Sequence, residues 1–277
     1  MKVSLIIAVY KDIEALNLIL QSLVDQTYKN FEVVISEDGR SKEIQEYIKT
    51  AKKDYCFEII HTIQDDTGVR KSRSQNNGIK ASTGEYLIFI DGDCILYSDF
   101  LHNHILLSSP KTIVSGRRVN LGPRYSQELR SGIIESKYLE KKFMMKYFDI
   151  SSDAKSEKHT EEGFRIKING LIDIFMNQKR KKRFPLLGCN MSFYKQAMLD
   201  INGFDEGLGN SAMAGDTDLE WRFESLGYKI RPGRFIVNLF HLYHTRSTSD
   251  YARGIDEKMI TNKNNNRFIC KEGIHQL

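Results

Sequence analysis

A pair of acidic residues directly after an apolar run is the strongest chemical signal in the chain. Asp91-Gly92-Asp93 follows Tyr86-Leu87-Ile88-Phe89-Ile90, which has the length and composition of a buried strand. In an open α/β sheet, ligands bind outside the carboxyl ends of the strands. Two carboxylates at such a position suit a hard divalent cation such as Mn²⁺ or Mg²⁺. Asp91 and Asp93 are therefore candidate metal ligands. A cation bound there could also attract a second anion, such as a diphosphate, and neutralise part of its charge.

A second acidic segment lies in the C-terminal half of the chain. The stretch Ala214-Gly215-Asp216-Thr217-Asp218-Leu219-Glu220-Trp221-Arg222 reads as the start of a helix, with an apolar face that continues to Gly227. Asp216 or Thr217 can cap this helix. A carboxylate at a helix N-terminus stays ionised, and an ionised carboxylate that faces a cleft is a competent general base. The alternative is that Asp216 and Asp218 are only capping charges.

Two histidines and four cysteines complete the residues with metal-binding chemistry. His241 and His244 follow the apolar segment Phe235–Phe240, and in a strand they would point apart, so joint ligation of one metal needs a turn. The alternative is one ligand supported by the other histidine. The cysteines are widely spaced, which predicts free thiols, not a disulfide framework or a zinc site: Cys56, Cys94, Cys189 and Cys270.

The N-terminal third must supply the elements that position the first acidic pair, because strand and helix patterns alternate there. The predicted strands are Val3–Val9, Phe31–Ser36, Phe57–His61 and Tyr86–Ile90, and the predicted helices are Ile13–Asp25, Ile44–Ala51 and Val69–Ala81. This alternation predicts βαβ units and a mostly parallel sheet. Because crossovers are right-handed, the loops after the strands lie along one edge. That edge collects Tyr10, Lys11, Asp12, Glu37, Asp38, Asp65, Asp66, Arg70, Asp91 and Asp93.

The rest of the chain is less regular. Ile113–Arg117 and Leu187–Phe193 are predicted strands, and residues 136–184 are predicted to be an insertion over the site, with no core of its own. The insertion begins with a basic, aromatic, amphipathic stretch (Lys137–Phe148), continues with a polar segment predicted to be mobile (Ser151–Glu162), and ends with a basic run (Lys179–Arg183). That run is either a solvated loop or a contact with membrane phosphate or a phosphorylated acceptor.

We therefore expect a single domain over residues 1–277. Residues 1–93 form its nucleotide-binding half, residues 94–260 its acceptor-binding half, and residues 261–277 a loosely ordered tail. The composition is that of an ordinary globular protein, with 40% hydrophobic residues, 28% charged residues and a formal charge of +5. No apolar run approaches the roughly 20 residues of a membrane helix, and the apolar start is too short for a signal peptide, so we expect a cytoplasmic protein. We expect no nucleic-acid partner, and the oligomeric state stays open.

Together, these motifs resemble family-two glycosyltransferases with the GT-A fold, over essentially the whole chain. Val3–Tyr10 resembles the family's first strand and nucleotide loop, and Ser36-Glu37-Asp38-Gly39-Arg40-Ser41 resembles its Asp-Asp-Gly-Ser loop. The stretch from Gly84 to Asp93 resembles its central segment with the metal-binding Asp-x-Asp. Three later segments resemble galactosyltransferase-like members: Gly188–Phe193, Gly203-Phe204-Asp205-Glu206 and Gly215–Arg222.

The resemblance implies roles for individual residues. Asp38 would contact uracil, and the other implied donor-binding residues are Tyr10, Asp12, Arg70, Asp91 and Gly92. Asp216 would be the base, and the implied acceptor-binding residues are Asn190, Asp218 and Arg222. The histidine pair resembles a metal-binding Met-x-x-His, so Asp91, Asp93, His244 and His241 would hold Mn²⁺ or Mg²⁺, with His244 the firmer match. Gly215 stands where the family usually has Glu, and the usual Trp-Gly is missing from Gly209–Ala214.

The expected activity is the inverting, metal-dependent transfer of a hexose or N-acetylhexosamine. The donor would be a UDP-sugar, and the acceptor a glycan or lipid-linked glycan of bacterial surface polysaccharide synthesis, with peripheral contact at the inner face of the membrane. Two alternatives remain. A nucleotidyltransferase would carry a glycine-rich loop after the first strand, whereas Ala8-Val9-Tyr10-Lys11-Asp12 has no glycine. A non-catalytic nucleotide-sugar-binding protein need not keep Asp91, Asp93, Asp216 and His244 together.

Overall fold

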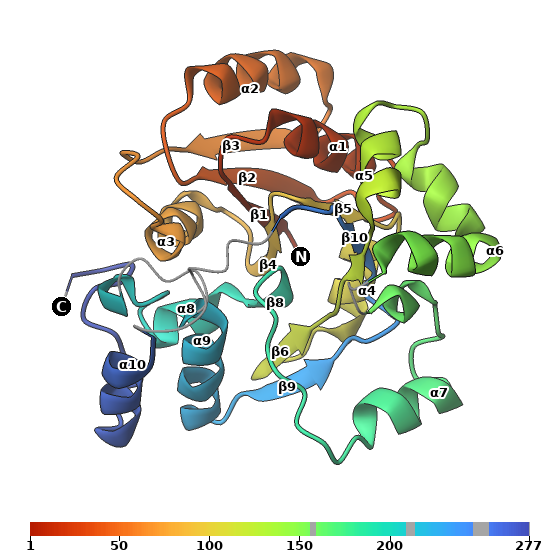
Figure 1. Cartoon of the computed structure of the whole chain (residues 1–277). Coiled ribbons are helices and arrows are strands. Elements are labelled where there is room, and N and C mark those ends of the chain that lie inside the picture. The colour runs from red at the N-terminus through yellow and green to blue at the C-terminus, as the bar shows by residue number, and fades with distance from the viewer. Residues whose placement is uncertain (156–158, 209–213, 246–254, 277) are drawn as a thin grey trace.

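A mixed seven-stranded sheet runs through the centre of the computed structural model, which describes residues 1–155, 159–208, 214–245 and 255–276 (Figure 1). The strand order is β3-β2-β1-β4-β8-β6-β9. All neighbouring strands are parallel except β8, which runs antiparallel between β4 and β6. The strands are β1 (Val3–Val9), β2 (Phe31–Glu37), β3 (Glu58–Thr62), β4 (Tyr86–Asp91), β6 (Thr112–Ser115), β8 (Asn190–Tyr194) and β9 (Lys229–Pro232).

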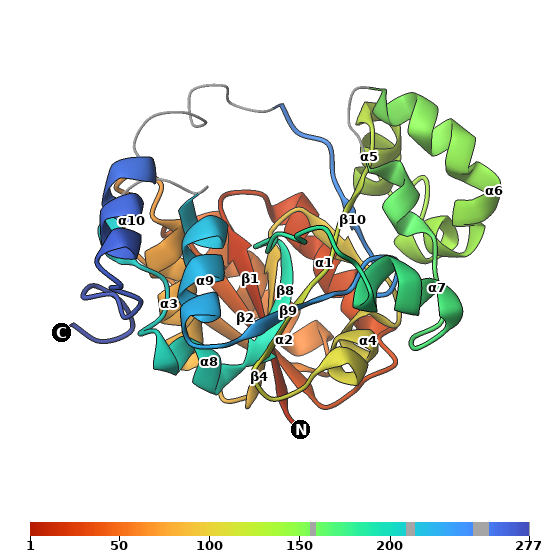
Figure 2. The ribbon, with the colours of Figure 1, turned by 90° about the horizontal axis from the view of Figure 1, so that it is seen from below.

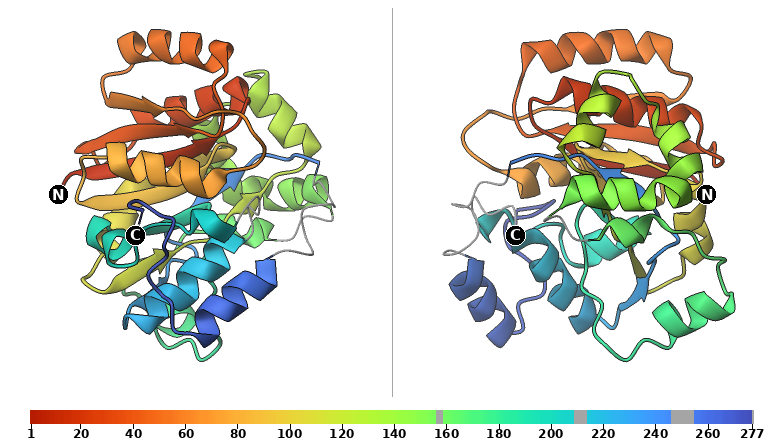
Figure 3. Two further views of the ribbon diagram at one scale, coloured as in Figure 1. Left: turned by 90° about the vertical axis from the view of Figure 1, so that its left-hand side faces the viewer. Right: turned by 45° about the vertical axis from the view of Figure 1, so that its right-hand side comes forward.

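Helices cover both faces of this sheet, which is why its central strands are apolar along nearly their whole length (Figures 2 and 3). Leu5 and Ile7 of β1 pack in one core cluster with three helices, whereas Ile6 packs in a second cluster with three others. The first three helices are α1 (Ile13–Val24), α2 (Lys42–Asp54) and α4 (Phe100–Leu107). The others are α3 (Lys71–Ala81), α8 (Lys195–Asp200) and α9 (Ala214–Ser225). The mostly parallel α/β sheet expected from the sequence is confirmed, and the elements of the N-terminal third begin and end within a few residues of the predicted bounds.

A small three-stranded sheet, β5-β10-β7, stands beside the main one. Its strands are β5 (Cys94–Leu96), β7 (Val119–Asn120) and β10 (Leu239–His241), and α5 (Pro123–Arg130) and α6 (Ser136–Ala154) pack against it. Strand β10 is antiparallel to β5, with His241 opposite Cys94. This pairing brings the C-terminal part of the chain next to the end of β4.

The insertion over residues 136–184 does share its core with the rest of the domain. Leu139, Phe143 and Ile150 of α6 lie in one cluster with Phe240 and Leu242. The prediction of a mobile segment over Ser151–Glu162 stays a prediction, and the structure shows regular elements in its described residues. Ser151–Ala154 complete α6, and Thr160–Gly163 form a 3₁₀ turn (η1) whose Glu162 is buried beside Arg234. The insertion then continues through α7 (Leu171–Asp173) and a π-helical turn, η2 (Ile174–Gln178).

The tail, predicted to be loosely ordered, packs against the domain through its described residues. After the 3₁₀ turn η3 (Glu206–Leu208) and helix α10 (Ile255–Asn264), the chain packs back onto the loop that follows α8. Asn202 donates its side-chain amide to the carbonyls of Cys270 (2.8 Å) and His275 (2.9 Å), and Ile274 is buried in the core. A side chain that bonds backbone groups fixes a segment whose own composition is polar. Within the described residues, no helix is long and apolar enough to cross a membrane.

An ion pair inside α9 holds the tail in place. Arg222 and Asp218 are each 2% exposed at the side chain, and Arg222 Nη1 lies 2.9 Å from Asp218 Oδ2. The same guanidinium donates to the carbonyl of Phe268 in the tail (2.9 Å) and to that of Ile201. Asp218 also accepts from the indole of Trp221 (3.0 Å). Every polar group of the pair therefore has a partner inside the protein.

We predict that Arg222→Leu lowers the free energy of unfolding by about 3–5 kcal/mol, because it leaves the Asp218 carboxylate buried without its cation. Urea denaturation followed by circular dichroism measures this change. Arg73→Leu is the matched control, since the Arg73 side chain is 51% exposed and its nearest carboxylate, on Glu206, is 4.0 Å away. Equal stability of the two variants would contradict this role of Arg222.

Candidate functional site

A cavity of about 510 Å³ opens at the carboxyl edge of β1, β2 and β4. Its walls come from the loops after β1, β2, β3 and β4, together with Arg130 of α5 and the segment Leu242–His244. The predicted gathering of the strand-end loops is therefore found, and the volume lies in the range of small-ligand sites. Of the predicted site residues, the lining includes Tyr10, Asp12, Asp38, Asp91, Gly92, Asp93 and His244.

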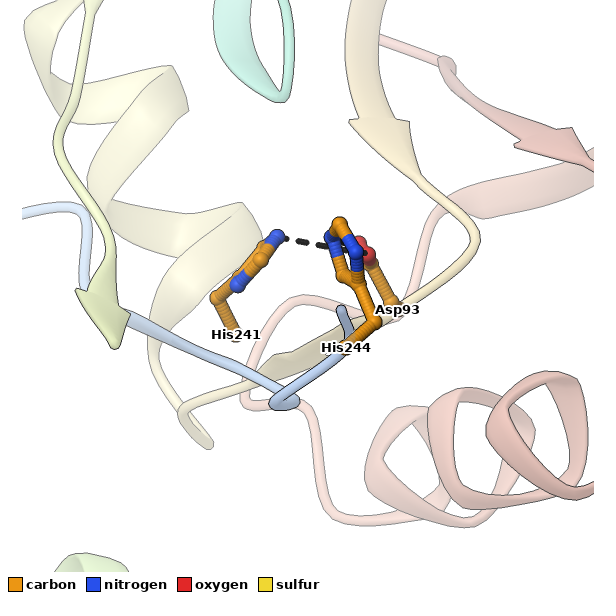
Figure 4. A group of neighbouring side chains, drawn as sticks. All are labelled: Asp93, His241 and His244. Carbon is orange, nitrogen blue, oxygen red and sulfur yellow. Dashed lines mark ion pairs between the residues drawn. The ribbon is translucent and has the colours of Figure 1, made fainter. Parts of the chain in front are cut away.

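The carboxylate of Asp93 meets both histidines at one side of this cavity (Figure 4). Nε2 of His241 lies 3.2 Å from Asp93 Oδ2, and Nε2 of His244 lies 3.4 Å from the same oxygen. The turn that joint ligation requires is present, because β10 ends at His241 and the amide of Leu242 donates to the Asp93 carbonyl (3.0 Å). One ligand atom from each residue lies within 4.8 Å of the other two. One carboxylate oxygen and two imidazole nitrogens form a donor set that fits Mn²⁺ or a similar divalent cation.

The surroundings of Asp93 keep its carboxylate ionised, which favours a bound cation. Burial alone would raise the pKa of this carboxyl group, but the hydrogen bond from His241 and the nearby His244 and Arg118 hold the pKa below its ordinary value. Asp93 is therefore ionised throughout the neutral pH range. Because the Asp93 carboxylate is already ionised, it can bind a cation without first releasing a proton.

Asp91 has a different partner from Asp93. Its Oδ1 lies 2.5 Å from Nζ of Lys71, the first residue of α3. Burial would lower the pKa of Lys71, but the charges of Asp91 and Asp216 outweigh it and raise the pKa above its ordinary value. Lys71 is thus a fixed cation in the cavity, and sequence reasoning missed it by choosing its neighbour Arg70. The adjacent basic pair at a helix start was the signal that could have found it.

Arg70 acts through its backbone in this structure. Its amide donates to Asp38 Oδ2 (2.7 Å), and Gln64 Nε2 donates to Asp38 Oδ1 (2.6 Å). The Arg70 guanidinium instead donates to the carbonyl of Asp65 and is absent from the described lining of the cavity. Asp38 is consequently held in one orientation at the end of β2. Tyr10, which is 54% exposed, lies at the cavity mouth with its hydroxyl 2.8 Å from Lys11 Nζ.

Arg130, the last residue of α5, holds the Asp12 carboxylate in place. The two guanidinium nitrogens of Arg130 lie 2.9 and 2.7 Å from the two Asp12 oxygens, and Asp12 also caps α1 by accepting from the Ala15 amide (2.9 Å). Burial raises the pKa of Asp12, but Arg130 and the Ala15 amide more than offset this and lower it. Arg130 is a further cavity residue that sequence reasoning missed, since it follows Asp12 by more than a hundred positions.

Asp216 lies in the first turn of α9, close to Lys71. Its Oδ2 accepts from the Gly188 amide (2.7 Å), and a Cβ at residue 188 would collide with Oδ1, so a larger residue there would displace the Asp216 carboxylate. Burial raises the pKa of Asp216, although the charge of Lys71 and the Gly188 amide oppose this shift. The net shift is opposite to the one that a helix N-terminus alone would give. A carboxylate with a raised pKa is a stronger base once ionised.

The three predicted acceptor-binding residues face the interior of the protein. Asn190 is fully buried, donates to the carbonyls of Arg117 and Val237, and pairs with a ring nitrogen of His104. Asp218 and Arg222 form the ion pair described above. All three have their polar groups paired inside the protein in this structure, and their acceptor role stays a prediction. Residues 209–213, where the missing Trp-Gly would stand, lie outside the described residues.

The sequence matches the model of glycosyl transferase family 2 over residues 4–165. It is 32% identical over 135 residues to an uncharacterized glycosyltransferase of Rickettsia bellii, a match that covers 47% of this chain and 19% of that protein. It is 30% identical over 105 residues to the amylovoran biosynthesis glycosyltransferase AmsB of Erwinia amylovora, covering 38% of this chain and 35% of that protein. The matches thus span about a fifth to a third of these relatives.

Solved structures with the same fold include a mannosyltransferase and the protein TarS. A mannosyltransferase of Pyrobaculum calidifontis in complex with GDP-Man and Mn²⁺ superposes with a TM-score of 0.58 at 14% identity, covering 89% of this chain and 58% of that one. TarS residues 1–349 of S. aureus in complex with UDP-GlcNAc superposes with a TM-score of 0.53 at 15% identity, covering 91% and 62%. At these identities the likeness concerns the fold alone.

We predict that Asp93→Asn weakens Mn²⁺ binding at least about tenfold, because the amide removes the anionic ligand. We also predict that His244→Ala weakens it more than His241→Ala, since His244 is the firmer match to a ligand and His241 the more readily replaced. Titration of free Mn²⁺ by electron paramagnetic resonance measures each affinity. His102→Ala is the control, because His102 is exposed on α4 and absent from the cavity lining. The reverse order of the two histidine variants would overturn the assignment.

Proposed function

The chain belongs to glycosyl transferase family 2, and we propose that it transfers a hexose or N-acetylhexosamine from a UDP-sugar to a glycan hydroxyl with inversion at the anomeric carbon. One observation carries the proposal. The cavity is lined by a candidate nucleotide contact (Asp38), by Asp93 and His244 of the candidate metal site, and by Lys71. The charge of Lys71 acts on Asp216, a partly buried carboxylate just outside the lining whose pKa is raised. A relative that acts in amylovoran biosynthesis supports bacterial surface polysaccharide as the setting.

The donor half of the site would hold the nucleotide through fixed groups. Both Asp38 oxygens already accept one hydrogen bond each, and each keeps a lone pair that can accept an N–H from uracil. The exposed ring of Tyr10 offers a surface against which a base can stack. Lys71, held by Asp91, supplies a positive charge close to where the diphosphate would lie. A UDP-sugar complex of a protein with this fold is consistent with such a donor.

Asp93, His241 and His244 would hold a divalent cation, Mn²⁺ or Mg²⁺, with Asp91 as a further candidate ligand. When bound, such a cation supplies Lewis-acid chemistry that offsets the charge of the leaving diphosphate. Asp91 can contribute only if its ion pair with Lys71 rearranges, because its Oδ1 is already 2.5 Å from the ammonium group. In the described structure, Lys71 and Arg118 are the protein's own cations that act on Asp91.

Asp216 would act on the acceptor side as general base. The Gly188 amide orients its carboxylate, and Lys71 opposes its protonation. Asp216 takes the proton of the acceptor hydroxyl as that oxygen bonds to the anomeric carbon, and the bond from this carbon to the diphosphate oxygen breaks. Attack on the face opposite the leaving group inverts the anomeric configuration. The family match and the loop without glycine after β1 favour this reaction over nucleotidyl transfer.

We further propose peripheral contact with the inner face of the cell membrane through exposed apolar side chains on two elements, α6 and α7–η2. They are Met144, Met145 and Phe148 of α6 and Leu171 and Phe175 of α7–η2, which are 67–83% exposed. Phe143, an aromatic residue of the same amphipathic stretch, is buried in the core and takes no part in this contact, whereas Met145 is exposed. Lys179 and Lys181 follow η2 in sequence and have no carboxylate partner among the described residues. Cations next to exposed apolar side chains suit an anionic bilayer.

Asp216→Asn is expected to lower kcat about 10²–10⁴-fold, because the isosteric amide cannot accept the proton. The measurement is UDP release from a panel of UDP-sugars with a polysaccharide-derived acceptor, alongside UDP affinity by calorimetry, which should change little. In the wild type, activity should fall as the pH drops through a pKa above the 3.8 of an ordinary aspartate, since burial raises the pKa of Asp216. Asp200→Asn is a control, because Asp200 bonds Gln196 and Tyr228 and is absent from the described lining of the cavity. Turnover retained in Asp216→Asn would place the base elsewhere.

For the membrane contact, we predict that the double variant Met144→Gln/Phe148→Gln loses most of its sedimentation with vesicles that contain phosphatidylglycerol. The apolar side chains supply the shallow insertion, and the lysines supply attraction that weakens at high salt. Val24→Gln, which changes a 50% exposed apolar residue at the end of α1, should sediment like the wild type. Binding to pure phosphatidylcholine vesicles that equals binding to anionic ones would rule out the charge contribution.

A further inference from the structure

A second cavity, of about 800 Å³, lies beside the edge strand β9 and has no role in the site described above. Its walls come from the end of α4, from η2 and the residues that follow it, and from the start of β9. In Figure 1 the chain that follows α7 passes β9 here before it enters β8. This is the segment that carries the basic run Lys179–Arg183. Among its described lining, no residue is shared with the first cavity.

Two polar atoms of the residues that line this cavity lack partners within the described structure. Asn177 is 2% exposed, and its Oδ1 accepts no hydrogen bond. Its amide orientation is fixed, because Nδ2 donates to Asp173 Oδ1 (2.9 Å) and to the carbonyl of Arg234 (3.1 Å). Nε of Arg180 is likewise buried and unpaired. Buried polar atoms are almost always satisfied, so an unpaired acceptor and an unpaired donor in the wall of one cavity mark a place where a ligand would complete the hydrogen bonding.

The charge of the cavity wall is strongly positive. Arg180, Lys182 and Lys229 line it, and none of them has an ion-pair partner in the part of the chain that the structure describes. Two other lining cations are neutralised: Arg183 lies 2.6 Å from Glu220, and Arg231 lies 2.7 Å from Asp173. Glu224 contributes the one carboxylate among the described lining residues. The excess cations select an anionic ligand.

The remaining wall is apolar and partly aromatic. Phe184 and Tyr228 line the cavity together with Leu107 and Ile168. The guanidinium carbon of Arg117 lies 3.6 Å from the Phe184 ring centroid, and that of Arg180 lies 5.4 Å from it, so the ring is held between two cations. A bare inorganic anion would leave this wall and the Asn177 acceptor unused. A ligand with an anionic group, a hydroxyl and a hydrocarbon face uses all three.

The cavity is connected to the catalytic side by a short stretch of chain. Phe184 lines the cavity, and Gly188, four residues later, donates its amide to Asp216. Four residues span at most about 14 Å even when fully extended. We propose that this cavity binds an anionic sugar unit, bearing phosphate or carboxylate, of an acceptor glycan whose hydroxyl end reaches Asp216. That the cavity binds such a sugar unit does not depend on the proposed function, whereas the assignment of this unit to the acceptor glycan does.

Isothermal calorimetry with glucose 1-phosphate as probe tests the binding, in the presence and absence of UDP with Mn²⁺. The wild type should bind the probe equally well in both conditions. Arg180→Gln and Lys182→Gln should each weaken binding about tenfold or more, since each removes a charge-assisted hydrogen bond. Lys181→Gln is the matched control, because it makes the same charge change in the same run at an exposed residue outside the described lining, and its affinity should stay within about twofold. Circular dichroism checks that each variant is folded.

Three outcomes would contradict the proposal that this cavity binds an anionic sugar unit. They are loss of probe binding when UDP is present, equal weakening by all three variants, and binding of methyl glucoside or inorganic phosphate as tight as that of glucose 1-phosphate. If Arg180→Gln and Lys182→Gln instead lose binding only to phosphatidylglycerol vesicles, the anionic group belongs to a lipid and the sugar assignment is wrong. Asp216→Asn separates the two proposals, because it should abolish transfer and leave probe binding unchanged. Probe binding by a wild type that transfers no sugar would remove the acceptor assignment and keep the site.

Discussion

The structure depends on neutralising the carboxylates that its parallel strands place at one edge of the sheet. Asp12, Asp91 and Asp93 follow β1 and β4, which are adjacent, and Asp216 lies close enough to raise the local charge further. Each has its own partner. Arg130 holds Asp12, Lys71 holds Asp91, two histidines hold Asp93, and a backbone amide holds Asp216. Without these partners, like charges in a partly buried cavity would oppose folding.

The partners come from distant parts of the chain, so neutralisation ties the outer elements to the main sheet. Arg130 arrives with α5, and the histidines arrive with β10 and the turn that follows it. The small sheet of β5, β10 and β7 therefore does more than cover the core. Its register sets His241 opposite Cys94 and so beside Asp93. The insertion supports this register from behind, since Phe143 of α6 packs against Phe240.

Polar residues that stabilise the fold can be told from those that face the cavities by whether their side chains have hydrogen-bond or ion-pair partners inside the protein. Asn190, Asp218 and Arg222 have acidic, amide or basic side chains in motifs that resemble a site, yet all their groups are paired inside the protein. Asp173 and Glu220 likewise neutralise two of the cations around the second cavity. Among the residues that line the second cavity, Asn177 Oδ1 and Arg180 Nε are the buried side-chain atoms left without a hydrogen-bond partner in the described structure.

The sequence by itself determined the N-terminal βαβ units, because the period of its apolar residues is a local property that sets each element and its face. It also determined that Asp38, Asp91 and Asp93 share an edge, since right-handed crossovers leave parallel strands no other arrangement. Only the tertiary structure decided which charges meet. The pairing of Asp12 with Arg130, the choice of Lys71 over the Arg70 side chain, and the raised pKa of Asp216 all depend on burial and on contacts between residues far apart in the chain. The order of the tail was hidden for the same reason: the bonds that hold it come from the Asn202 side chain, and no pattern within residues 265–276 records them.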